Sequence, residues 1–283
     1  SHFAFAADEP EVSVEVNPGT IDAAGLERLR RAGCNRLSIG VQSFDDPALA
    51  VLGRIHSAGQ ARATVRAART AGFENLSLDL MYGLPGQGAA GWRATLEQAL
   101  ALGPDQLSLY ELTPETGTPL AADLDAGRLC LPSEEEVLAM MAVNEALVAA
   151  SPLSRYEISN YAAAGRECRH NLNYWNNGCY LGLGPGATAF YGGVRRTAAA
   201  DPDEYCRRLE EGRSAWQVEE RLDREAAFRE TVVLGLRLTA GVDEAALRER
   251  FGLDPAAYYG PLLEHLVAQG LLGNALGTSG APL

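Results

Sequence analysis

A short pattern that occurs three times limits the folds open to this chain. Residues 31–39, 70–78 and 101–109 each contain a glycine that is followed, four positions later, by leucine, serine and an aliphatic residue. Glycine commonly ends a helix because it adopts the left-handed conformation without strain. The aliphatic segment after it is typical of a strand buried in a parallel sheet. The repeat therefore predicts that helices and strands alternate along this part of the chain.

The segments before each glycine support this prediction. Thr20 and Ser57 are expected to cap two helices, and a third helix carries Trp92 and Leu96 on one face. A further strand is predicted at residues 11–16. A repeat of roughly 30–40 residues has the length of a strand–helix unit, and right-handed crossovers join such units into a parallel sheet or barrel. A closed barrel needs about eight strands, so we expect an α/β fold with an open sheet or a partial barrel.

The character of the sequence changes after this region, and three segments are expected. They are residues 1–125, 126–200 and 201–283, with a domain boundary near residue 200. In the middle segment a helix is predicted at 134–150 and a strand at 155–161, with loops rich in glycine, asparagine and aromatic residues at 167–192. The last segment is predicted to be a smaller, mostly helical, winged-helix-like domain with helices at 226–236, 244–251 and 255–269.

The composition restricts the partners and the location of the chain. Its net charge of −13 disfavours nucleic acid and anionic lipid, and residues 223–270 carry five Arg and eight acidic residues. No apolar run reaches the ~20 residues of a membrane span. The five cysteines are scattered, which predicts reduced thiols and a cytoplasmic location.

Polar residues stand at the carboxyl ends of the predicted strands, where parallel α/β folds place their ligands. These residues are Glu15, Gln42, Asp79 and Thr113, and Arg54 follows in a loop after the second repeat. Carboxylates suit amines and ribose hydroxyls, and a guanidinium suits a carboxylate. A shared polar ligand is one interpretation. The alternative is that these side chains cap strands or pair with neighbours, as in an ion pair between Asp79 and Arg54.

Several longer segments carry a family resemblance. They are EVNPGT at 15–20, RLSIGVQSF at 36–44, LGRIH at 52–56, NLSLDLMYGLPGQ at 75–87, LSLYELT at 107–113, YEISNYA at 156–162 and HNLNYW at 170–175. In order and spacing they resemble the HemW-type radical S-adenosylmethionine (SAM) heme chaperones, a family related to oxygen-independent coproporphyrinogen III oxidase. The resemblance covers about residues 2–192 and is looser beyond them.

The resemblance implies a fold, cofactors and an activity. It implies a partial (β/α) barrel that binds a 4Fe–4S cluster and SAM, followed by a smaller C-terminal domain. The positions that contact SAM in the family match Glu15, Gln42, Arg54 and Asp79, with Thr113 at the end of the last barrel strand. The implied function is to bind heme and transfer it to a heme-accepting protein. The alternative is oxidative decarboxylation of coproporphyrinogen III by the related enzyme.

One motif of the family is associated with heme, and it matches His170, Asn171, Tyr174 and Trp175. A neutral imidazole can bind heme iron, and aromatic rings can flank the macrocycle. The alternative is that His170 lies in a loop and only bonds to the backbone. A second histidine that the family carries further on is replaced here by Thr188.

The chain departs from the family in one defining feature, the Cys-x3-Cys-x2-Cys loop that holds the cluster. Its cysteines, Cys34, Cys130, Cys168, Cys179 and Cys206, do not have this spacing. In the family the loop precedes the first segment matched here, so we expect a barrel that lacks its first two strand–helix units and carries no metal. Such a chain would not perform radical chemistry alone. The exposed edge of its sheet predicts a homodimer or aggregation.

Overall fold

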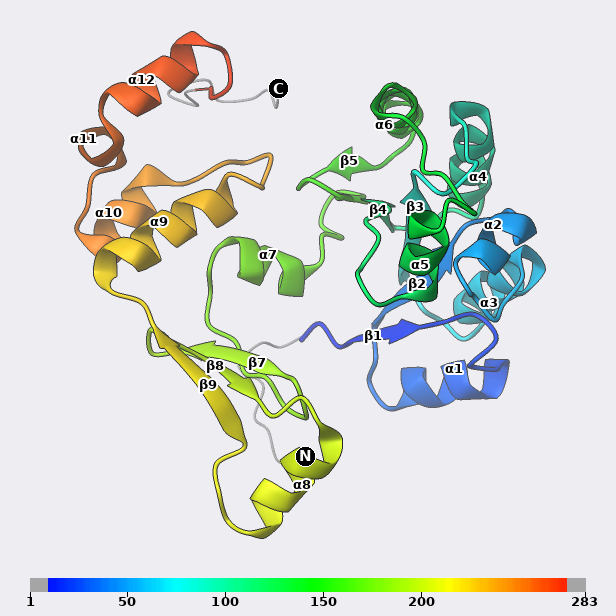
Figure 1. Cartoon of the computed structure of the whole chain (residues 1–283), viewed down its shortest axis with the longest axis horizontal. Coiled ribbons are helices and arrows are strands. Elements are labelled where there is room, and N and C mark those ends of the chain that lie inside the picture. The colour runs from blue at the N-terminus through cyan, green and yellow to red at the C-terminus, as the bar shows by residue number, and fades with distance from the viewer. Residues whose placement is uncertain (1–9, 274–283) are drawn as a thin grey trace. The chain divides into compact units, whose positions relative to one another are not determined.

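The computed structural model describes residues 10–273, and the chain divides into two compact units between Arg169 and His170 (Figure 1). A boundary near residue 200, as the sequence suggests, would cut a sheet. Strand β9 (Trp216–Arg221) pairs with strand β8 (Val194–Ala198) across that point. The finer division into residues 1–125, 126–200 and 201–283 stays a prediction.

The predicted parallel strands are present in the first unit. Strands β1 (Ser13–Val16), β2 (Arg36–Gln42), β3 (Asn75–Tyr82) and β4 (Gln106–Glu111) pair in parallel in this order. Each Leu-Ser-aliphatic repeat lies in one of the strands β2, β3 and β4. The predicted α/β fold with a parallel sheet is therefore confirmed, and it is consistent with a partial barrel.

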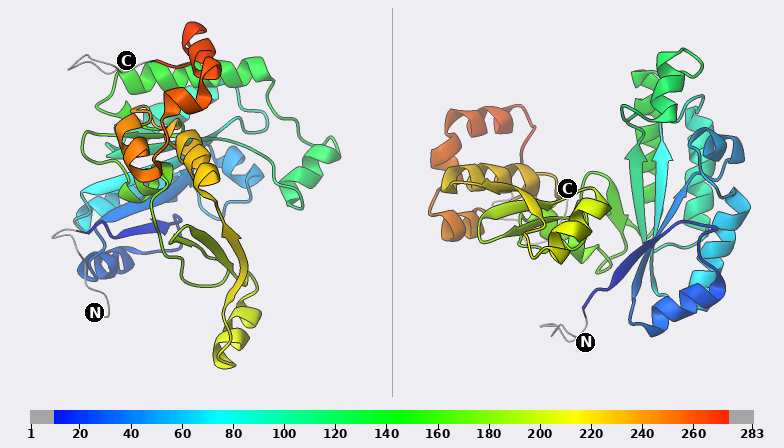
Figure 2. Two further views of the ribbon diagram at one scale, coloured as in Figure 1. Left: turned by 90° about the vertical axis from the view of Figure 1, so that its left-hand side faces the viewer. Right: turned by 60° about the horizontal axis from the view of Figure 1, so that its bottom comes forward.

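The helices of the first unit cover one face of this sheet. Figure 2 shows α1, α3, α4 and α6 on the same side of the strands. The buried leucines of β2, β3 and β4, with Ile39 of β2, pack there in one core with residues of these helices, because alternate side chains of a strand point to the same face. The helices are α1 (Ala23–Arg31), α2 (Asp46–Val51), α3 (Ala58–Thr70), α4 (Ala89–Ala101), α5 (Pro119–Asp125) and α6 (Glu134–Ala149).

Local signals located most helix ends correctly. Ser57 caps α3, where its side chain and that of Gln60 bond reciprocally to the backbone. The prediction that Thr20 caps α1 is wrong. The cap is Asp22, whose carboxylate accepts from the Gly25 amide at 2.7 Å. The Thr20 hydroxyl instead donates to the Asn17 carbonyl at 2.7 Å and closes the turn after β1.

The single strand expected at residues 155–161 is a hairpin. Strands β5 (Ser154–Arg155) and β6 (Asn160–Ala162) pair antiparallel, and the Tyr156 amide donates to the Asn160 carbonyl at 3.1 Å. Strand β6 also pairs antiparallel with β4, which gives the order β1-β2-β3-β4-β6-β5 within the described residues. Because β5 and β6 run antiparallel, a short turn is enough to join them, whereas two adjacent parallel strands would need a crossover connection.

The second unit contains an antiparallel sheet and several helices. Its strands β7 (Thr188–Tyr191), β8 and β9 are joined in that order. The loops predicted at 167–192 include a helix, and the single helix predicted at 255–269 is two helices. The two helices are separated at Gly260, which has φ +49° and precedes Pro261. The helices are α7 (Arg169–Trp175), α8 (Pro202–Glu210), α9 (Arg224–Gly235), α10 (Glu244–Phe251), α11 (Pro255–Tyr259) and α12 (Pro261–Ala268).

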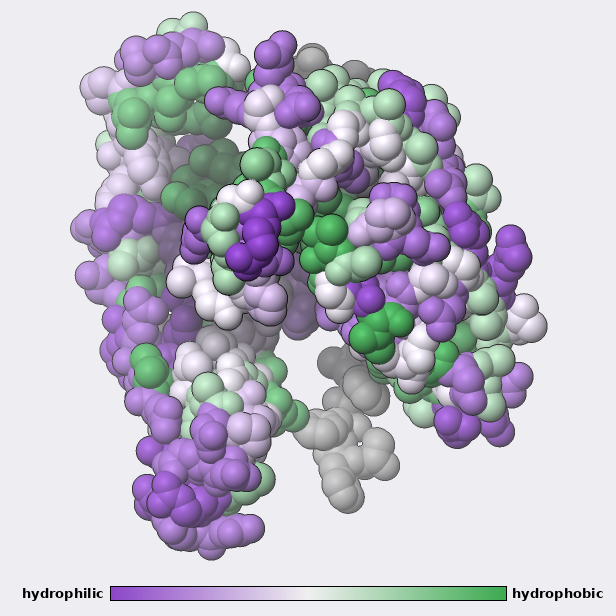
Figure 3. All heavy atoms as spheres, turned by 45° about the vertical axis from the view of Figure 1, so that its right-hand side comes forward, coloured by the Kyte–Doolittle hydropathy of each residue, from purple (hydrophilic) through white to green (hydrophobic). Residues whose placement is uncertain are grey.

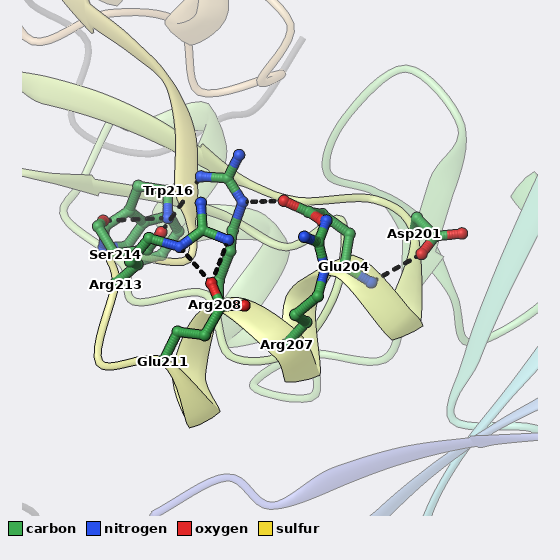
Figure 4. A network of polar contacts seen from close by, with 8 residues as sticks. All are labelled: Asp201, Glu204, Arg207, Arg208, Glu211, Arg213, Ser214 and Trp216. Carbon is green, nitrogen blue, oxygen red and sulfur yellow. Dashed lines mark hydrogen bonds and ion pairs between the residues drawn. The ribbon is translucent and has the colours of Figure 1, made fainter.

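Polar contacts organise the connection from α8 to β9 (Figure 4). Asp201 caps α8 by accepting from the Glu204 amide at 2.8 Å, and Glu204 pairs with Arg207 and Arg208. Arg213 pairs with Glu211 at 2.6 Å in the following turn. These ion pairs are partly exposed, so each contributes little to stability and they serve mainly to order the turn.

The exposed surface is mixed in character. The face in Figure 3 carries hydrophilic and hydrophobic residues side by side. Single exposed apolar side chains such as Ile55, Leu181 and Leu183 are ordinary on a protein surface. Within residues 10–273 no helix is long and apolar enough to cross a membrane.

Candidate functional site

The second face of the parallel sheet is polar. In register, Glu15 of β1 lies beside Ser38 of β2, and Ser38 lies beside Ser77 of β3. Asp79, two positions after Ser77 and on the same face, lies beside Ser108 of β4. The serine of every Leu-Ser-aliphatic repeat thus points away from the helices, and these serines surround a carboxylate.

Asp79 is the central charged group of this polar face. The Ser38 hydroxyl lies 2.9 Å from both of its carboxylate oxygens. Burial raises the pKa of Asp79 above its usual value, hydrogen bonds from Ser108 and Ser38 oppose this, and the negative charge of Glu15 raises it further. A ligand that brings N–H or O–H donors or a positive charge would stabilise the ionised carboxylate.

Gln42 lies at the carboxyl end of β2, and its side chain packs closely over Gly40. Its φ of +63° is unusual for a residue other than glycine, and the strand register shifts between Gly40 and Gln42. A Cβ atom on Gly40 would lie 2.9 Å from Asn17 Oδ1 and 3.0 Å from Gln42 Nε2. The absence of a side chain at Gly40 therefore lets two amide side chains close over the strand beside Asp79.

Arg54 lies in the loop that follows α2, and this loop is tied to the same end of β2. His56, two residues on, is buried, and its Nε2 lies 3.1 Å from the Val41 carbonyl. Within residues 10–273 no ion pair joins Arg54 to Asp79, and the cationic neighbour that acts on the pKa of Asp79 is Arg36. The suggested Asp79–Arg54 ion pair is therefore not formed.

The structure brings together three of the five residues predicted to bind SAM. It brings Glu15, Gln42 and Asp79 to one region of the polar face, with Glu15 exposed and Asp79 largely buried. Arg54 lies near the end of β2, because it is two residues before His56, whose ring contacts the Val41 carbonyl of that strand. Thr113 is exposed in the loop after β4. The ligand roles of these five residues stay predictions.

Sequence reasoning missed a polar cluster at the β4–β6 edge. Burial raises the pKa of Tyr110, hydrogen bonds from Ser108 and Asn160 lower it, and the charges of Asp79 and Glu157 raise it. The side-chain amide of Asn160 donates to Glu157, a carboxylate that is 1% exposed. The sequence places Tyr110 among the polar residues at the end of the fourth strand, but its neighbours from the antiparallel partner β6 are a tertiary feature.

A second polar group lies toward the amino ends of the strands. The guanidinium of buried Arg36 donates to Ser13 Oγ at 2.8 Å and to Gln106 Oε1 at 2.7 Å. The Gln106 amide in turn donates to Asn75 Oδ1 at 3.1 Å. These contacts join β1, β2, β3 and β4 across one face, so they hold the sheet on which Asp79 stands.

The predicted heme motif lies on helix α7 rather than in a loop. His170 is exposed, and its ring meets that of Tyr174, one turn later, edge to face at 4.6 Å between centroids. Tyr174 also lies 4.5 Å from Tyr180, which is 6.4 Å from Phe190. An exposed imidazole beside a row of aromatic rings can offer a nitrogen to iron and apolar surface to a macrocycle.

The other two motif residues lie on a different stripe of the same helix. Asn171 and Trp175 are one turn apart, and the Arg237 guanidinium lies over the Trp175 ring at 4.5 Å from its centroid. Arg237 belongs to the turn after α9, so this contact joins two helical regions of the second unit. The motif thus presents a histidine–tyrosine pair and an asparagine–tryptophan pair.

A metal cluster is not supported by the described residues. Within residues 10–273 no group of three His, Cys, Asp or Glu side chains is placed to hold a metal ion. None of the cysteines among residues 10–273 forms a disulfide, and Cys34 and Cys168 are buried. These residues therefore do not fit a 4Fe–4S cluster.

Comparison with family models and known proteins defines the class of this protein. Residues 2–99 match the Radical SAM superfamily, and residues 222–275 match the HemN C-terminal domain. Together with the parallel sheet and its polar face, these matches define a radical SAM protein. Within that class the chain belongs to the HemW family of heme chaperones.

The relatives that show the family come from several bacteria. The chain is 36% identical over 270 residues to the heme chaperone HemW of Bacillus subtilis, covering 95% of this chain and 71% of the relative. It is 38% identical to HemW of Synechocystis, covering 85% of this chain and 59% of the relative. The chain thus spans only part of the length of these proteins.

A solved structure supports the fold. Coproporphyrinogen III oxidase (HemN) from Escherichia coli, described as a radical SAM enzyme, is similar with a TM-score of 0.78 and 25% identity. The similarity covers 92% of this chain and 63% of that one. The family and the fold expected from the sequence are therefore confirmed.

Replacing Asp79 by Asn should stabilise the protein. At neutral pH the substitution removes a buried negative charge but keeps an oxygen that accepts from Ser38, so we expect the free energy of unfolding to rise by about 1 kcal/mol. Since the pKa of Asp79 is higher in the folded than in the unfolded protein, wild type gains stability as the pH falls through the folded value. The advantage of Asp79→Asn should shrink over that range in urea denaturation. A variant that is less stable at neutral pH would contradict this account.

Proposed function

We propose that this chain binds heme through helix α7 and passes it to a heme-accepting protein, with SAM bound at the polar face of its parallel sheet. The observation that carries the proposal is the exposed His170 on α7, packed against Tyr174 within a motif associated with heme in this family. The imidazole is the candidate ligand of the iron. The aromatic row from Tyr174 to Phe190 offers contact to the macrocycle.

The polar face suits a ligand with an amine, a ribose and a carboxylate. Glu15 and Asp79 would accept from the amine and the ribose hydroxyls, and Arg54 would bind the carboxylate through two parallel hydrogen bonds. Gln42 can both donate and accept, and Thr113 would lie at the rim after β4. SAM combined with a 4Fe–4S cluster supplies a radical when both are bound. The ligands of that cluster would come from outside the described residues.

The polar face should lose SAM affinity when Gly40 gains a methyl group. In Gly40→Ala the new Cβ would displace the side-chain ends of Asn17 and Gln42, which can move at little cost to stability. We expect SAM to bind about tenfold more weakly by titration calorimetry, with the melting temperature nearly unchanged. Gly59→Ala is the control, since a Cβ there meets Ser57 Oγ only at 3.6 Å. Equal SAM affinity in both variants would argue against this site.

The heme proposal is tested on His170. In His170→Ala the proposed iron ligand is removed, so the absorption spectrum of bound heme should shift and the affinity should fall on the order of tenfold. His265→Ala is a matched control, because His265 is also exposed and lies in α12, outside the motif. If His170→Ala retained the wild-type spectrum and affinity, the proposal would fail.

An enzymatic function is the second candidate, favoured by the structural similarity to coproporphyrinogen III oxidase. If the protein is an oxidase, a longer form that carries the cluster loop should convert coproporphyrinogen III to protoporphyrinogen. The assay supplies SAM, a reductant and an electron acceptor, and each of two propionates loses CO2, a hydrogen atom to the SAM-derived radical and one electron to the acceptor. Stoichiometric heme binding without such turnover supports the chaperone. Product analysis by chromatography separates these outcomes.

Self-association is also proposed. Strand β1 pairs with β2 and with no other strand among the described residues, and an open strand edge is a template for pairing. We expect the chain alone to form dimers or larger species at micromolar concentration in sedimentation equilibrium. A monomer over the whole concentration range would contradict this. We also propose the cytoplasmic location that the scattered, odd number of cysteines in the sequence suggests.

A further inference from the structure

Trp175 and Arg237 form a cation–π pair with two unused hydrogen-bond donors. The guanidinium carbon of Arg237 lies 4.5 Å from the centroid of the Trp175 ring. Trp175 Nε1 and Arg237 Nε are both buried, and neither has a hydrogen-bond partner in residues 10–273. Buried N–H groups without an acceptor are rare in folded proteins. Two of them on one contact call for an explanation.

The two groups cannot satisfy each other. The indole nitrogen and the guanidinium are donors only, so both need an acceptor from elsewhere. Contact with the indole face helps to hold the guanidinium in place, and a guanidinium suits a planar acceptor with two oxygens, such as a carboxylate. The pair is therefore an oriented set of donors that carries a positive charge.

Several other arginines of the unit pair with carboxylates. Arg195 pairs with Glu220 and Glu230 at 3.0 and 2.8 Å, and Arg196, Arg229 and Arg248 also meet carboxylates of the chain. Within the described residues no carboxylate pairs with Arg237. Exposed Arg221 and Arg224, and Arg250, which donates to the Asn176 and Asn177 carbonyls, also have no ion pair within the described residues. What distinguishes Arg237 is its buried Nε, which has no partner and lies in the same contact as the unpartnered Trp175 Nε1.

We infer that Trp175 and Arg237 bind a carboxylate of the porphyrin, which for heme is a propionate. This inference rests on the proposed heme function. The carboxylate would accept from the Arg237 guanidinium and from the indole N–H, forming charge-assisted hydrogen bonds. Trp175 lies five residues after His170, about 7.5 Å along the helix axis, a distance that one porphyrin can span.

The two stripes of α7 then have separate tasks. His170 and Tyr174 face the iron and the ring, whereas Trp175 and Arg237 hold the acidic edge of the ligand. A porphyrin bound at both points would have a fixed orientation, which neither point would give alone. Arg237 lies well outside the motif, so the motif alone does not define this subsite.

The test compares heme with heme dimethyl ester, whose propionates carry no charge. Both are titrated, in the same detergent buffer, into wild type and into Arg237→Met, which keeps an apolar stem over the indole. We expect wild type to bind heme about tenfold more tightly than the ester. Arg237→Met should lose that difference by weakening heme binding alone. Trp175→Phe should weaken heme binding by about threefold, since it keeps a ring but removes the N–H.

Arg229→Met is the matched control, because Arg229 lies on α9 near Arg237 but is paired with Glu225 and Tyr258. It should retain the wild-type preference for heme over the ester. Equal binding of heme and ester by wild type, or equal weakening of both by Arg237→Met, would overturn the inference and leave the heme proposal standing. Failure of wild type to bind either porphyrin would overturn both.

Discussion

The first unit depends on the alternation of side chains along its parallel strands. Each repeat turns leucine and an aliphatic residue toward the helices and serine toward the other face. The apolar face drives folding because it removes a large hydrocarbon surface from water. The polar face opposes folding, since Asp79 is largely buried there and the loss of hydration raises its pKa. A group that is unfavourable for the free protein and favourable for a bound cation is typical of a ligand site.

The geometry around Asp79 supports the same interpretation. Gln42 holds a left-handed conformation with φ +63°, and Gly40 leaves room for the side chains of Asn17 and Gln42. Strained conformations of this kind persist only where the surrounding structure enforces them, and they gather at binding sites. The contacts of Arg36 with Ser13 and Gln106 supply such a framework on the same face.

In the second unit the candidate site is formed by a helix rather than by the face of a sheet. Helix α7 presents successive residues in different directions, so a six-residue motif offers two chemically distinct stripes. One stripe carries an imidazole and a phenol, and the other carries an indole that makes a cation–π contact with Arg237. The chain belongs to the HemW family, but it spans 59–71% of the length of the first two relatives compared, and the heme role of the motif is a proposal. The activity of a longer protein is therefore a proposal for this chain.

Local patterns in the sequence determined the elements, because caps, glycines and periodicity act within a few residues. They gave the parallel strands, the Ser57 cap and the helix beginning at Glu134. They failed where residues far apart in the sequence determine the local structure. The hairpin at residues 154–162 depends on pairing with β4, and the helical form of the heme motif was hidden in a segment rich in glycine and asparagine. The environment of Asp79 and the partner of Trp175 are set by side chains from other elements. Only the tertiary structure brings those residues together, because hydrogen bonds and stacking act over a few ångströms of space, whatever the separation along the chain.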